Sequence, residues 1–180
     1  MAGNATTTKL EQDLGALIDS IDLPDVQKQF LRGRWLDQVV WMESAANRAR
    51  RRYYSLRLIT VLGAVLVPAL VSLNLAGNAD AAVDWLAFSV SLLVAASAAV
   101  DGFFHFGTLW RHYRAGVELL KSEGWSFAQL SGPYRRPKAT HASAFPSFVT
   151  RIETAIGQEV EEFVSRVARE PGESDQDEEA

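Results

Sequence analysis

Two long apolar stretches occupy the middle of the chain. Residues 58–75 contain no charged side chain, and residues 85–110 contain only one, Asp101. A helix over the first stretch would be about 27 Å long, close to the roughly 30 Å thickness of a bilayer's hydrocarbon core. A short polar connector, residues 76–84, joins the two stretches. The pattern predicts an all-α membrane protein with a two-transmembrane helical hairpin, its spans at about residues 56–75 and 84–106.

The positions of the basic residues indicate how this hairpin is oriented. No lysine or arginine lies between Arg57 and Arg111, whereas arginines crowd the two ends of that interval: Arg48, Arg50, Arg51, Arg52, Arg57, Arg111 and Arg114. The connector carries Asp80 and Asp84 and no basic residue. The positive-inside rule therefore predicts a multi-pass protein of the cell inner (plasma) membrane with both termini cytoplasmic. The alternative is a buried hairpin within a soluble helical bundle.

The segments before the hairpin also have helical periodicity. Residues 1–22 are predicted to form an N-terminal amphipathic helix that begins with a capping box at Thr8 and Glu11. A long cytoplasmic helix is predicted over about residues 24–52, and we expect it to run unbroken into the first span. Its apolar residues recur every three or four positions: Leu31, Trp35, Val39, Met42, Ala46, Ala49 and Tyr53.

The segments after the hairpin follow the same rule. A cytoplasmic helix over about residues 107–123 should continue the second span and end at Gly124, a plausible C-cap. A C-terminal amphipathic helix is predicted at about residues 146–168, with apolar residues Val149, Ile152, Ile156, Val160, Phe163 and Val167. Residues 169–180 are acidic and are expected to be disordered. Residues 23–168 would then form one two-transmembrane domain with long helical extensions.

Small residues on the second span are candidates for helix packing. Ser91, Ala95 and Ala99 follow one another at intervals of four residues. Small side chains at this spacing let two membrane helices approach closely. The row therefore predicts a contact surface for assembly of several copies.

Polar residues near the cytoplasmic end of the second span are candidates for lining a pore. Ser97, Asp101 and His105 have i, i+4, i+8 spacing, which places them on one face of a continuous helix. A ring of Asp101 carboxylates around an axis would attract cations. The alternative is that Asp101 lies in the headgroup zone and pairs with an arginine of a neighbouring helix, such as Arg57.

A second candidate network lies on the cytoplasmic extension of this span. Arg114 and Glu118 are an i,i+4 pair, and Glu118 and Lys121 an i,i+3 pair. With Trp110 and Tyr113 they could lock the extension against a neighbouring helix. A solvated face of salt bridges is the alternative.

Composition and motifs argue against several functions. The formal net charge is −4, so a general cationic field for nucleic acid is absent. The chain has no cysteine and three scattered histidines, and it lacks phosphate-loop, metalloprotease and nucleophile-elbow patterns. We therefore expect no enzyme activity, no cofactor, no metal site and no nucleic-acid partner.

Short motifs around the hairpin resemble a known family. They are RYYSLR at residues 52–57 before a span with Gly63 and Pro68, WRHYR at residues 110–114, ELLKSE at residues 118–123 and GPY at residues 132–134. In this order, across roughly residues 25–168, they resemble the SLATT superfamily of bacterial two-transmembrane domains. The resemblance implies a membrane effector that forms pores and is tied to nucleotide-signalled defence systems. With no fused sensor domain in this chain, it implies a stand-alone defence or stress effector.

Two functions remain open at this point. The first is a homo-oligomeric ion channel or pore, because two spans cannot enclose a channel alone. The second is a membrane-anchored scaffold or adaptor whose cytoplasmic helices bind a partner. The expected partners are the lipid bilayer and further copies of the chain, together with a cytoplasmic protein or a nucleotide signal.

Overall fold

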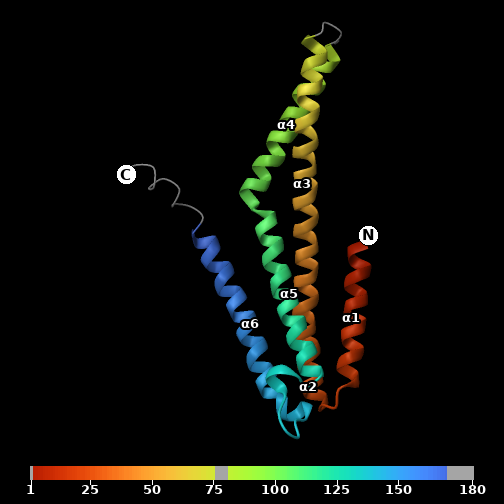
Figure 1. Ribbon diagram of the computed structural model, residues 1–180, viewed down its shortest axis with the longest axis vertical. Coiled ribbons are helices and arrows are strands. Elements are labelled where there is room, and N and C mark those ends of the chain that lie inside the picture. Colours follow the sequence, from red (N-terminus) through yellow and green to blue (C-terminus); the bar gives the residue numbers. More distant parts are fainter. Residues whose placement is uncertain (1, 76–80, 170–180) are drawn as a thin grey trace, which may run out of the picture. The chain divides into compact units, whose positions relative to one another are not determined.

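The computed structural model describes residues 2–75 and 81–169, with side chains placed for residues 7–72 and 81–158. Within these ranges the chain is helical and has no strand (Figure 1). Its elements are α1 (Ala2–Ser20), α2 (Asp25–Phe30), the π-helix η1 (Leu31–Leu36), α3 (Asp37–Leu75), α4 (Ala81–Phe104), α5 (Phe106–Ala128), the 3₁₀ turn η2 (Gly132–Tyr134) and α6 (His141–Arg169). The middle of the predicted connector, residues 76–80, and the predicted acidic tail from residue 170 lie outside the described residues.

The chain divides into two compact units. The first, here called the bundle unit, consists of Met1–Glu43 and Arg114–Ala180. The second, here called the hairpin unit, is Ser44–Tyr113. The boundary between them falls inside α3 and inside α5.

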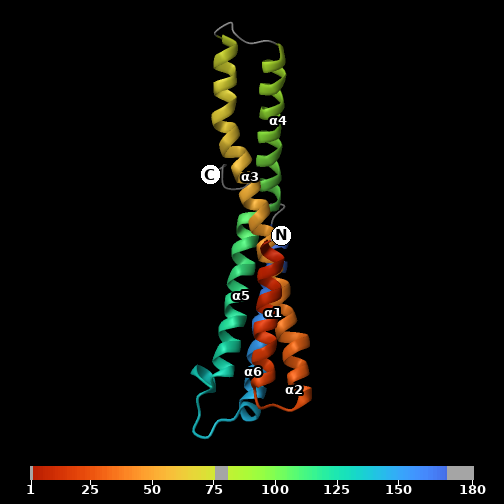
Figure 2. The same ribbon diagram turned by 90° about the vertical axis from the view of Figure 1, so that its right-hand side faces the viewer.

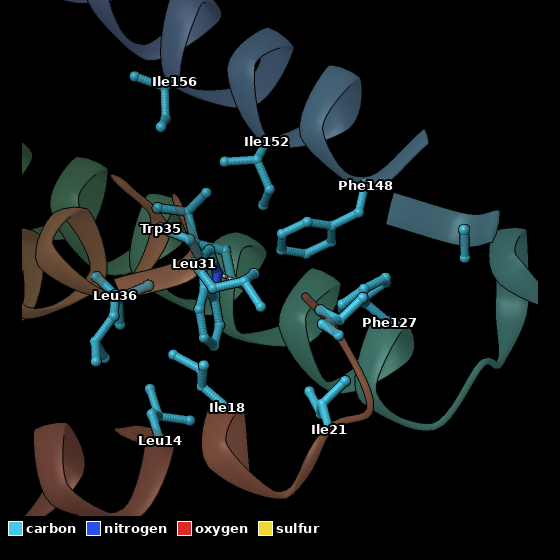
Figure 3. Close-up of a cluster of buried hydrophobic side chains, with 14 of the residues drawn as sticks. Leu14, Ile18, Ile21, Leu31, Trp35, Leu36, Phe127, Phe148, Ile152 and Ile156 are labelled. Atoms are coloured by element: carbon cyan, nitrogen blue, oxygen red, sulfur yellow. Dashed lines mark hydrogen bonds between the residues drawn. The ribbon is translucent and has the colours of Figure 1, made fainter. Parts of the chain in front are cut away.

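The bundle unit has a well-packed apolar core built from the predicted amphipathic faces. Trp35 lies among side chains from α1, such as Ile18, and from α6, such as Phe148 and Ile152 (Figure 3). The buried members of this core are Leu14, Ile18, Ile21, Leu23, Leu31, Trp35, Leu36, Val39, Met42, Val117, Leu120, Phe127, Tyr134, Ala144, Phe148, Ile152 and Ile156. Burial of these side chains is the main favourable contribution to folding of the unit.

The long helix before the hairpin is continuous, as predicted. It runs without a break from Asp25 to Ser72. A π-helical segment, η1, interrupts the α-helical hydrogen bonding near its start. The wider turn lets Leu31, Trp35 and Leu36 all face the core, although Leu36 is not part of the predicted apolar seam.

Three predicted helix ends are wrong by several residues. Helix α1 begins at Ala2, so Thr8 lies inside it and not at its N-terminal cap. Helix α5 does not end at Gly124 but continues to Ala128, and Leu130 beyond it adopts a positive φ of 47°. The amides of Leu130 and Ser131 donate to the carbonyls of Phe127 and Ser126, which is a Schellman ending. A non-glycine residue therefore terminates the helix, and glycine alone is a misleading signal here.

The C-terminal helix begins at His141 rather than at residue 146. Thr140 and Ser143 cap it reciprocally, since the amide of each donates to the hydroxyl of the other, at 3.0 and 3.2 Å. This pairing satisfies the amide of Ser143 in the first turn and the amide of Thr140 just before the helix. Pro146 then lies inside the helix, and the carbonyl that loses its donor belongs to the exposed Ala142.

In the hairpin unit, α3 and α4 run side by side in opposite directions (Figures 1 and 2). Their close approach depends on Gly63, because a Cβ added there would lie 2.0 Å from Cγ2 of Val94. Near the other end of the unit, a Cβ on Gly107 would meet the ring of Tyr53 at 2.9 Å. Glycine at these two positions lets the helices pack at short distance.

Candidate functional site

The hairpin unit exposes a large amount of apolar side chain. In each candidate span, only 6% of the most apolar stretch is buried within the chain. The large exposed side chains of α3 and α4 include Leu58, Val61, Leu62, Val65, Leu66, Val71, Trp85, Leu86, Phe88, Leu92, Leu93, Val100, Phe103 and Phe104. Soluble monomers rarely expose an apolar surface of this extent. By length and composition, both helices could cross a membrane.

The predicted packing row lies on the exposed surface of α4. Ser91, Ala95 and Ala99 are all exposed, whereas α4 packs within the chain through Val94 and the buried Ser97. The hydroxyl of Ser91 donates to the carbonyl of Ala87 at 2.7 Å, so it is satisfied inside its own helix. The row is therefore available for contact with another chain.

The second span and its cytoplasmic extension are two helices, and the prediction of one continuous helix is wrong. Helix α4 ends at Phe104 and α5 begins at Phe106. His105 between them has a φ of 48°, in the left-handed region that non-glycine residues seldom adopt. Aromatic packing stabilises this break, because the rings of Phe104 and Phe106 stack with centroids 5.3 Å apart. The guanidinium of Arg52 covers the Phe106 ring at 5.6 Å.

The three candidate pore-lining residues differ in their exposure. Ser97 is buried, Asp101 is half-buried and His105 is exposed. In the single chain they do not form one exposed row. Whether any of them lines a pore in an assembly stays a prediction.

A pocket of about 270 Å³ lies beside the break. Its lining comes from α3, from the end of α4 and from the start of α5: Tyr53, Asp101, Gly102, His105, Gly107, Thr108, Trp110 and Arg111. One carboxylate oxygen of Asp101, Oδ1, is buried and has no hydrogen-bond partner among the described residues.

The predicted charge network on α5 contacts a neighbouring helix of the same chain. Lys121 Nζ lies 2.7 Å from Oε2 of Glu43 on α3, and Arg114 Nη1 lies 3.2 Å from Oε1 of the same carboxylate. Glu118 binds Arg114 at 2.7 Å but is largely exposed. Glu43 is buried, so it is the centre of the network.

Sequence reasoning missed Glu43, although a signal was present. Glu43 comes four residues after Val39, which places it on the buried face of the long helix. An acidic residue on such a face needs a basic partner. The other two predicted members, Trp110 and Tyr113, belong to the hairpin unit, where the Trp110 and Tyr54 rings lie 6.1 Å apart.

A second network in the bundle unit was not predicted. Arg151 Nη2 donates to Oε2 of the buried Glu123 at 3.0 Å, and the Tyr134 hydroxyl donates to Oε1. Burial alone would raise the pKa of Glu123, but the hydrogen bonds from Arg151 and Tyr134 outweigh it and lower the pKa. Burial, together with the Glu123 carboxylate, raises the pKa of Tyr134. Among the described residues, no group of three or more histidine and acidic side chains could hold a metal ion.

A family model matches the chain over residues 37–142, which is more than half of its length. The family is described as "Protein of unknown function (DUF4231)". The chain belongs to this family. No curated protein and no solved structure matches it.

The DUF4231 region begins with α3 and ends at the start of α6, so it contains the whole hairpin unit. It includes Glu43 with Arg114 and Lys121, but Arg151 and helix α1 lie outside it. The family description gives no activity, and the resemblance to SLATT domains stays a prediction.

Proposed function

We propose that this chain is a membrane protein whose hairpins associate into an ion-conducting pore. The observation that carries the proposal is the surface of the hairpin unit. Its two long helices expose large apolar side chains to their surroundings and are scarcely buried. Lipid is the environment in which such a surface is stable.

A pore requires that several copies assemble. A hairpin of two spans cannot enclose a channel. The exposed row Ser91, Ala95 and Ala99 offers the small side chains that let helices of neighbouring copies pack closely. Within its own chain α4 uses a different face, so packing of the hairpin and packing between copies do not compete.

The single chain gives no indication of ion preference. Ser97 is buried inside the hairpin unit, and Asp101 lines a pocket of its own chain. Of the predicted row, only His105 is exposed in the single chain. The resemblance to SLATT domains extends the proposal to a defence or stress effector. The distribution of arginines places it in the plasma membrane with both termini in the cytoplasm.

A membrane-anchored adaptor is the second candidate, and the surface of the bundle unit favours it. Val26, Trp41, Leu119 and Trp125 are large apolar residues that are between 48% and 78% exposed. Exposed aromatic residues of this kind are enriched where proteins bind partners. In this case the hairpin would serve only to tether the bundle unit.

Ion flux from proteoliposomes tests the proposal. Ala95→Leu adds bulk in the middle of the exposed small-residue row and should reduce both flux and oligomer mass. Ala96→Leu makes the same change at an exposed position about 100° further around the helix and should leave both unchanged. Light scattering in detergent gives the oligomer mass. Wild-type protein that inserts but gives no flux, or that is a strict monomer or dimer, would favour the adaptor.

A further inference from the structure

The pocket beside the break at His105 has an unusual combination of charges. Asp101 supplies a carboxylate and Arg111 a guanidinium to the same lining. Neither side chain makes an ion pair with any described residue, although both line one space of about 270 Å³. Thr108 adds a hydroxyl group at the start of α5.

The Asp101 carboxylate constrains what fills this pocket. Oδ1 is closed to solvent and has no hydrogen-bond partner among the described residues, so a donor in the pocket would reach the carboxylate through its other oxygen. A cationic N–H group is the donor that satisfies a carboxylate best. Arg111 in the same lining would repel a simple cation, but it would attract an anionic group attached to that donor. The lining is therefore complementary to a small molecule that carries both an ammonium and an anion.

The position of the pocket indicates the source of such a group. Phe103 and Phe104, next to the lining residues in sequence, are 77% and 55% exposed. Arg111 is the first basic residue after the apolar stretch. If the hairpin crosses a bilayer, this is where apolar surface gives way to charge, which is the level of the lipid headgroups.

We propose that the pocket binds the headgroup of a zwitterionic phospholipid with a primary ammonium, as in phosphatidylethanolamine. The ammonium donates to Asp101, while Arg111 and Thr108 hold the phosphate. The proposal rests on the membrane insertion that is part of the proposed function, and it is independent of ion conduction.

Native mass spectrometry of the detergent-solubilised chain tests lipid choice directly. The probes are dioleoyl phosphatidylethanolamine, the matching phosphatidylcholine, whose quaternary ammonium has no N–H group, and the matching phosphatidylglycerol, which has no ammonium. The wild-type chain should prefer phosphatidylethanolamine to phosphatidylcholine by about tenfold, since one charge-assisted hydrogen bond separates them. Asp101→Asn should remove this preference.

Further variants separate the two halves of the headgroup. Arg111→Gln and Thr108→Val should weaken the binding of all three lipids. The ratio of the affinities for phosphatidylethanolamine and phosphatidylcholine should stay unchanged. Arg50→Gln removes an exposed arginine of α3 that does not line the pocket and should change neither quantity. Thr108→Val keeps the size of the side chain, so it gives an answer even where a charge substitution impairs folding.

Several results would overturn the proposal. Equal binding of the three lipids would do so, as would an unchanged preference in Asp101→Asn. Displacement of the lipid by free phosphoethanolamine at equal concentration would assign the pocket to a soluble ligand and contradict the lipid source. Flotation of the protein with liposomes is measured alongside: protein that does not float refutes membrane insertion, whereas floating protein without lipid preference refutes only the headgroup site.

Discussion

Gly124→Ala should destabilise the bundle unit, although the same change at an open helical position normally stabilises a protein. Gly124 is buried in α5, and a Cβ added there would lie 2.1 Å from Cζ2 of Trp35 and 2.8 Å from Cε2 and Cη2. The indole has little room to retreat. It is 2% exposed, its Nε1 donates to the carbonyl of Leu120 at 3.0 Å, and it packs edge-on against Phe148 (Figure 3).

The expected size follows from two opposing contributions. Replacing glycine by alanine inside a helix gains about 1 kcal/mol. Overpacking a rigid core typically costs about 1–3 kcal/mol, and a contact near 2 Å belongs at the upper end of that range. The free energy of unfolding should therefore fall by about 1–2 kcal/mol.

Gly157→Ala is the matched control, because Gly157 is exposed on α6 and no described side chain beyond its two chain neighbours lies within 4 Å of its added Cβ. It should raise the free energy of unfolding by up to about 1 kcal/mol. Urea unfolding of the full chain in mild detergent, followed by tryptophan fluorescence, measures both variants. In the Trp35→Phe background, where the ring atoms nearest the new methyl are absent, Gly124→Ala should lose most of its effect. The reasoning is refuted if Gly124→Ala stabilises the chain as Gly157→Ala does.

Further predictions concern the ion pairs, the pH dependence and the topology. Glu43→Gln should lower the free energy of unfolding by about 1–3 kcal/mol, because it leaves Lys121 without its buried partner, whereas Glu118→Gln at the exposed end should change it by less than about 0.5 kcal/mol; equal effects in urea unfolding would contradict this. The lowered pKa of Glu123 means that the unfolded chain takes up a proton more readily, so stability present at neutral pH is lost as pH falls below about 4.5. The urea midpoint should therefore fall less steeply with acid in Glu123→Gln than in the wild type, and identical pH profiles would count against the contribution of Glu123. Since the chain has no cysteine, Asn78→Cys in the connector should react with an impermeant maleimide on intact cells and Lys138→Cys only after permeabilisation; the reverse pattern would invert the topology.

The helical architecture was predictable because it depends on local periodicity. The spacing of Leu31, Trp35, Val39 and Met42 identifies a face that is buried in the structure. The two long apolar stretches likewise identify helices that are apolar and exposed. Such patterns repeat every turn, so the buried face of each helix can be identified from its own sequence, whatever packs against it.

The features that were missed depend on residues far apart in the sequence or on local geometry without a periodic signal. Glu123 meets Arg151 from 28 positions away, and no local pattern relates the two. The break at His105 interrupts an apolar pattern that continues on both sides, and it is stabilised by Arg52 on another helix. Just after the end of α5, Leu130 adopts a left-handed backbone conformation, a position at which sequence rules favour glycine.

Current recordings across a planar bilayer test the central claim most directly. Purified wild-type protein should produce discrete current steps, and Ala95→Leu reconstituted at the same density should suppress them while Ala96→Leu retains them. This result would follow from pore assembly through the exposed row Ser91, Ala95 and Ala99 of α4. Protein that is inserted and oligomeric but gives no current would contradict the pore. Current steps of equal size and frequency in both leucine variants would contradict the assigned contact surface.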